Sequence, residues 1–203
     1  VAQESFIALA DDIRDVNTNL PIVVVDTFNV TIPGGDSEPG SSFSVIIQPD
    51  EVTGRAHITA AHDFAGKVGL RVRGRSSASF PKRQYKFEIQ DENGNDLDAS
   101  LLGMPSESDW VLHAPYTDKS LMRNFFSYRL WESLGYWSPR TQFVEVFLNT
   151  DGDERVSYED DYVGVYVLME GIKAGEDRVD IQSPEDPTRG EQVTGGFLIE
   201  TGN

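Results

Sequence analysis

The chain has 203 residues, 38% of them hydrophobic and 25% charged, which is the composition of a globular protein with a core. Its formal net charge of −17 argues against a nucleic-acid partner, because such binding needs a basic surface. No apolar run approaches the ~20 residues of a membrane-spanning helix. The sequence has no cysteine, which excludes disulfides, thiolate metal sites and cysteine nucleophiles.

Short β-branched or alternating segments, separated by turn-forming residues, predict strands along most of the chain. The predicted strands cover residues 20–27, 44–48, 54–60, 67–73, 84–90, 109–114, 141–148, 162–169, 178–181 and 196–201.

One helix is predicted over residues 119–134, with Asp118 at its N-cap and Gly135 at its end. Its apolar residues recur at helical spacing, as Leu121, Phe125, Tyr128 and Trp131. The predicted fold class is therefore α+β, an antiparallel-leaning β-sheet with one main helix.

Residues 71–86 form a strongly basic segment, which holds six of the 17 lysines and arginines of the chain and no acid. Small residues after Gly74 allow a turn whose backbone N–H groups point inward. Lys82 follows a Phe-Pro pair, which stiffens the backbone that leads to the lysine. Hydroxyls and a positioned lysine are what phosphate recognition needs. The alternative is a solvated basic face that pairs with the acidic remainder.

Arg123 and Glu170 are the other charged candidates. Arg123 lies inside the predicted helix, either on a solvated face or tying the helix to an acidic partner or a phosphate. Glu170 ends an apolar strand, either as a solvated strand end or as the counter-ion of a lysine, as in protein kinases. Asp109 is interpreted as a turn residue.

The acidic loop 149–160 places oxygen-bearing side chains at positions 1, 3, 5, 9 and 12 of a calcium loop. Glu154 stands where such a loop needs glycine, and position 12 is an aspartate rather than a bidentate glutamate, so tight calcium binding is not expected. A solvated hairpin loop is the alternative. The candidate ligands are Asn149, Asp151, Asp153, Ser157 and Asp160.

Together these blocks resemble the CotH kinase family over about residues 68–203. The resemblance is carried, in the order and approximate spacing of the family, by RVRGRSSASFPKRQYKFEI (71–89), SDWVLHAPYTDKSLMRNFFSYRLWESLG (108–135), YVGVYVLMEGI (162–172), RVDI (178–181) and GGFLIE (195–200). It implies that residues 67–203 are the N-terminal part of an atypical protein-kinase-like domain. Residues 1–66 are then an N-terminal β-rich extension.

The family phosphorylates proteins with ATP and a divalent metal, so the resemblance implies ATP and Mg²⁺ as cofactors and a protein as substrate. The catalytic acids of the family follow the strand at 195–200, so we expect them beyond Asn203 and expect no phosphate transfer by residues 1–203 alone. Members occur in exported bacterial proteins, which implies an extracellular or cell-surface location. The alternative is a non-catalytic surface or coat scaffold of the same fold, with calcium in the 149–160 loop.

The resemblance also implies roles for single residues. Lys82 is the leading phosphate-binding lysine and Lys86 the second choice. Arg123 and Glu170 are expected to support the site as a charged pair. The loop over the phosphates is expected to be shaped by Arg73, Arg75, Ser76 and Ser77.

Overall fold

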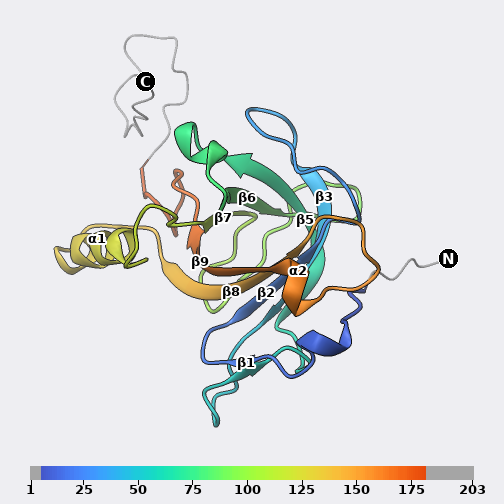
Figure 1. The fold of residues 1–203 in the computed structure, drawn as a ribbon. Coiled ribbons are helices and arrows are strands. Elements are labelled where there is room, and N and C mark those ends of the chain that lie inside the picture. Colours follow the sequence, from blue (N-terminus) through green and yellow to red (C-terminus); the bar gives the residue numbers. More distant parts are fainter. Residues whose placement is uncertain (1–5, 182–203) are drawn as a thin grey trace.

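A computed structural model describes residues 6–181, and most of them belong to a closed seven-stranded β-barrel. The ring order is β2-β3-β5-β6-β7-β9-β8 (Figure 1). Its strands are β2 (Ile22–Asp26), β3 (Gly40–Ile47), β5 (Phe64–Arg73), β6 (Gln84–Ile89), β7 (Asp109–His113), β8 (Thr141–Asn149) and β9 (Tyr162–Glu170).

Smaller elements decorate the outside of the barrel. Strands β1 and β4 form a separate two-stranded sheet. The bounds of these elements are η1 (Asp11–Ile13), β1 (Asn17–Thr18), β4 (Ala56–His57), η2 (Ser76–Ser79), α1 (Arg123–Ser133) and α2 (Tyr158–Asp161).

The barrel is closed by a parallel pairing of β2 with β8, whereas every other neighbouring pair is antiparallel. The closure gives the barrel two ends. At the Asn149 end, β2 and β8 finish and β9 begins; at the Glu170 end, β9 finishes and β7 begins. This distinction decides which polar residues can meet.

The barrel interior is filled by side chains that alternate along the strands, as β pleating requires. Trp110, Phe87 and Tyr166 are its largest fully buried members. A second core lies outside the barrel, where Ile13 of the N-terminal segment packs with Val24 and other outward-facing residues of the β2–β8 region. Burial of both faces of β2 explains its uninterrupted β-branched sequence.

The structure confirms the mixed α+β class and seven of the predicted strands, but the antiparallel-leaning sheet is a closed barrel. The predicted strand 54–60 is reduced to Ala56–His57, and residues 178–181 contribute only a bridge from Val179 to Ala174. The expected division between residues 66 and 67 falls inside β5, and β2 and β3 belong to the same ring. The predicted strand 196–201 lies outside the described residues.

The predicted start of the main helix is wrong by one turn, since α1 begins at Arg123. Asp118 is not the N-cap residue, yet its Oδ2 accepts a hydrogen bond of 2.8 Å from the Arg123 N–H, and its Oδ1 accepts one of 3.0 Å from the Ser120 N–H. The carboxylate therefore holds the preceding turn and the first helical amide together.

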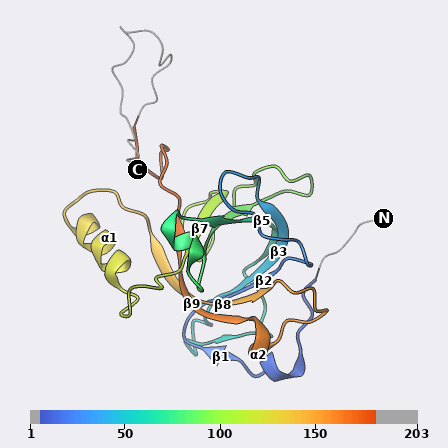
Figure 2. The same cartoon turned by 45° about the horizontal axis from the view of Figure 1, so that its top comes forward.

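Helix α1 has no buried residue, and both cartoon views place it outside the barrel beside β8 (Figures 1 and 2). Its contact with the barrel includes Phe125 against Phe143, with ring centroids 5.2 Å apart. The helix and its flanks expose large apolar side chains at Met122, Phe126, Leu130, Trp131, Leu134 and Tyr136. No helix within residues 6–181 is long and apolar enough to cross a membrane.

The role of Asp118 predicts a local effect on α1. Removing the carboxylate in Asp118→Ala should accelerate amide hydrogen exchange across residues 123–133, because an eleven-residue helix with little packing depends on its first-turn acceptors. Barrel amides should keep their protection. Glu92→Ala, which removes an exposed carboxylate from another turn, is the control, and unchanged exchange in α1 of the Asp118 variant would contradict this role.

Candidate functional site

The basic segment forms the end of β5, a connection and the start of β6 at the Asn149 end of the barrel. Arg71 and Lys86 are register partners on the two strands. Arg73 and Arg75 are exposed, while Ser76 and Ser77 begin the short helix η2, where Ser77 Oγ accepts a hydrogen bond of 2.8 Å from Gln84 Nε2.

Lys82 extends from this connection onto β9. Its Nζ donates a 2.6 Å hydrogen bond to the Val165 carbonyl and lies 4.5 Å from the centroid of the Tyr166 ring. A Cβ at Gly164 would lie 3.2 Å from that Nζ, so a glycine there leaves room for the ammonium group. Burial lowers the pKa of Lys82, while the charge of Glu145 acts in the opposite direction. Within residues 6–181 no ion pair involves Lys82.

Lys86 has a different environment, on the outer face of β6. Its Nζ pairs with the carboxylate of Glu88 and, at 3.1 Å, with Asp109 of β7. Burial acts to lower the pKa of Lys86, but the hydrogen bonds that its Nζ donates to these two carboxylates raise it above its usual value. The ammonium group is therefore already bound by two protein carboxylates.

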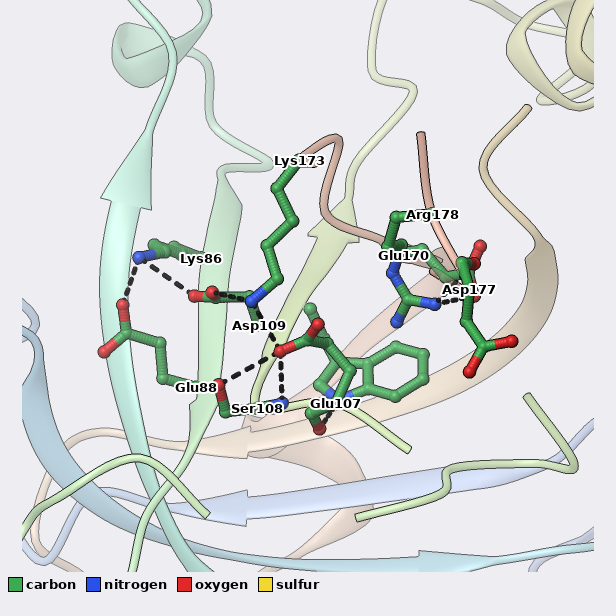
Figure 3. Close-up of polar contacts among 10 residues, drawn as sticks. Lys86, Glu88, Glu107, Ser108, Asp109, Glu170, Lys173, Asp177 and Arg178 are labelled. Atoms are coloured by element: carbon green, nitrogen blue, oxygen red, sulfur yellow. Dashed lines mark hydrogen bonds and ion pairs between the residues drawn. The ribbon is translucent and has the colours of Figure 1, made fainter. Parts of the chain in front are cut away.

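Asp109 links this pair to a second lysine. Figure 3 shows Asp109 between Lys86 and Lys173, and Lys173 Nζ lies 3.0 Å from Asp109 Oδ2 and 2.6 Å from Glu107 Oε1. Burial acts to raise the pKa of Asp109, yet its bonds to both lysines lower it. The result is an alternating chain of five charges along the outer edge of β6 and β7.

Glu170 is the anion of a separate, buried cluster at its end of the barrel. It lies opposite Trp110 in the β7–β9 register, and its side chain is fully buried. Its Oε1 pairs at 2.6 Å with Nη1 of both Arg140 and Arg178, and its Oε2 accepts a 2.9 Å hydrogen bond from the Arg140 N–H. Arg178 is 3% exposed, and its Nε and Nη2 have no partner within the described residues.

The expected pairing of Arg123 with Glu170 is wrong. Arg123 Nε lies 3.5 Å from Asp118, on the exposed start of α1, while Glu170 holds two other arginines. Lys82 and Glu170 are also apart, since Lys82 contacts β9 at Val165 and Glu170 is five residues along the same strand, roughly 17 Å away. The predicted site residues thus occupy two ends of the barrel.

Sequence reasoning missed most partners in the two charged clusters. Asp109 was interpreted as a turn residue, and nothing marked Arg140, Glu107 or Lys173 as members of a network. The available signal was a charge at the edge of an apolar strand, which is equally typical of a solvated strand end. Only the three-dimensional arrangement of the strand ends and of the connections beside them shows which of these charges meet.

The acidic loop also differs from the arrangement expected for a calcium loop. Ser157 Oγ accepts the Asp160 N–H at 3.2 Å as the N-cap of α2, and Asn149 Nδ2 donates a 2.9 Å hydrogen bond to the Asp153 carbonyl. Asp151 is exposed. In the part of the chain that the structure describes, no three His, Cys, Asp or Glu side chains form a group suited to a metal ion.

Comparison with protein-family models matches residues 70–192, more than half of the chain, to the model described as CotH kinase protein. No curated protein matches the sequence. The matched region begins just before the basic segment and contains both charged clusters and α1.

Glu170 should be essential for stability. Glu170→Gln leaves the buried guanidinium of Arg178 and the partly exposed guanidinium of Arg140 without their anion, and removing one partner of a buried pair costs about 3–5 kcal/mol. Urea unfolding should therefore show a large drop in the midpoint. The control is Glu132→Gln, which breaks the half-exposed pair with Arg129 and should cost under about 1 kcal/mol. Equal effects of the two substitutions would refute the structural role of Glu170.

Proposed function

Since the chain belongs to the CotH kinase protein family, we propose that it binds the phosphates of ATP with Mg²⁺ and serves the transfer of phosphate to proteins. The observation that carries the proposal is Lys82, a partly buried ammonium group held by a carbonyl and an aromatic ring with no carboxylate partner within residues 6–181. In a chain of net charge −17, such a cation favours an external anion.

The two candidate lysines differ in the partners that their ammonium groups already have. Lys86 already contacts two carboxylates, so a phosphate would have to displace Glu88 or Asp109. Lys82 has a lowered pKa because burial disfavours its charge, and a phosphate oxygen would relieve that cost. Lys82 is therefore the phosphate-binding lysine in this proposal, and Lys86 holds β6 to β7.

Further cations lie on the same hairpin. Arg73 and Arg75 are exposed at the end of β5 and in the connection that leads to Lys82. Burial lowers the pKa of His113 on β7, and the charge of Arg73, the register partner of Gln84 on β6, lowers it further. An anion at Lys82 would thus approach through a region of positive potential, which favours binding and speeds encounter.

Phosphoryl transfer needs positioned phosphates, a bridging metal and an acid that orients the attacking hydroxyl. In this proposal residues 71–86 supply the first of these. The 203 residues contain neither a His-Arg-Asp-x4-Asn nor an Asp-Phe-Gly sequence, so a catalytic acid is not assigned.

The proposal predicts that Lys82→Met weakens ATP–Mg²⁺ binding by about 10–100-fold, the value of one charge-assisted hydrogen bond. The melting temperature should stay close to that of the wild type, because the methionine keeps apolar contact with Tyr166 and removes a desolvated charge. Titration calorimetry measures the affinity.

Lys119→Met is a matched control, because Lys119 also lies near a tyrosine ring and a backbone carbonyl, those of Tyr116, but is exposed and outside the basic segment. Its ATP affinity should equal that of the wild type. Equal losses in the two variants would indicate a general charge effect and refute the role of Lys82. Absence of ATP binding by the wild-type protein would favour the non-catalytic scaffold.

A further inference from the structure

The end of the parallel β2–β8 pair gathers polar groups that the phosphate-binding role does not use. Asp26 and Asn149 are register partners at the last residues of the two strands, and the Thr27 N–H donates a 3.1 Å hydrogen bond to the Asn149 carbonyl. The preceding residues, Val25 and Leu148, face the barrel interior. By alternation, the side chains of Asp26 and Asn149 share the outer face.

The loops that follow the two strands pack against each other. A Cβ at Gly152 would lie 2.9 Å from the Cβ and Cγ atoms of Asn29, so the turn after β8 contacts the turn after β2. The Asn149 side chain enters this junction, since its Nδ2 donates to the Asp153 carbonyl. Its Oδ1 belongs to the same carboxamide and is buried without a hydrogen-bond partner, in a residue that is 0% exposed.

A buried amide oxygen without a donor is costly, typically about 1–3 kcal/mol. Thr27, which directly follows the last residue of β2, also has a buried hydroxyl oxygen without a partner. Both orphaned atoms are oxygens able to accept, and the Asn149 oxygen lies where the two loops meet. The buried Asn149 Oδ1 is therefore able to accept a hydrogen bond or to bind a cation at this junction.

The charges around the junction have the same sign. Burial raises the pKa of Asp26, and the nearby charge of Asp151 raises it further. Burial likewise raises the pKa of Asp161, with added repulsion from Asp151, Asp160 and Asp153. Within residues 6–181 none of these carboxylates forms an ion pair with a lysine or arginine.

We propose that this junction binds a divalent cation of the calcium type, with Asn149 Oδ1 as the buried ligand and the Asp26 and Asp151 carboxylates as the charged ligands. Calcium accepts six to eight oxygen ligands from carboxylates, amide carbonyls, backbone carbonyls and water, so it does not require three acidic side chains. The ligand set differs from the one that loop spacing predicts. Asp26 comes from β2, while Ser157 is the N-cap of α2 and its Oγ accepts a hydrogen bond from the Asp160 N–H.

Two protein carboxylates make a weak site, so we expect a dissociation constant of about 10⁻⁴–10⁻³ M, the range of extracellular calcium modules. Addition of 10 mM CaCl₂ to the metal-free protein should raise the melting temperature by about 3–10 °C relative to NaCl of equal ionic strength. The NaCl sample is the control for general ionic screening of the acidic protein. An equal rise in both salts would overturn the proposal.

Three Asp→Asn variants test which carboxylates bind the ion. Asp151→Asn changes an exposed loop residue and should abolish most of the calcium-dependent rise in melting temperature. Asp26→Asn should also abolish it while raising the melting temperature of the metal-free protein, because it removes a charge that is disfavoured by burial and by the nearby charge of Asp151. Asp96→Asn, in an exposed turn elsewhere, should keep the full response. A retained response in the Asp151 variant, or an equal loss in the Asp96 variant, would overturn the site.

A magnesium arm tests the identity of the ion. Mg²⁺ requires near-ideal octahedral geometry and keeps its water, so 10 mM MgCl₂ should give less than half of the calcium-dependent shift. An equal shift with magnesium would overturn the assignment to calcium. These measurements contain no nucleotide, so their failure leaves the role of Lys82 untouched.

Discussion

The closed ring of seven strands is the constraint on which the other features depend. Every strand of the ring is paired on both sides, and its interior is filled with apolar side chains. Polar chemistry is thereby confined to the outer face, to the connections and to the two ends. Lys82 and the Asn149 junction occupy one end, and Glu170 with its two arginines occupies the other.

Packing also separates residues that look equivalent in the sequence. Lys82 and Lys86 are four residues apart in one basic segment, yet Lys86 lies between two carboxylates and Lys82 lies against a ring and a carbonyl. The arginines of the chain likewise differ in whether the fold brings them to Glu170. The buried Glu170 pairs with Arg140, which precedes β8, and with Arg178, which follows β9, whereas Arg123 pairs with Asp118 at the exposed start of α1.

Local sequence patterns predicted most strands and the α+β class, because β-branched runs and turn residues act over a few residues. The same patterns contain no information on pairing partners, so the closure of β2 on β8 could not be predicted. The predicted start of α1 differs from the observed one because the Asp118 carboxylate binds both the turn at Ser120 and the amide of Arg123, where the helix begins. The basic segment was recognisable by charge alone, whereas Arg140 and Arg178 gain meaning only through a buried Glu170.

The parallel closure has a consequence for how the chain is made. Strands β2 and β8 pair across about 120 residues, so the ring cannot close until nearly the whole described chain has left the ribosome. At ~5–20 residues per second, that interval lasts roughly 6–25 s. During it, one edge of the IVVVD strand has no partner, and a nascent chain with such an edge is open to pairing with other chains. Slower translation therefore lengthens the time for which this edge stays unpaired.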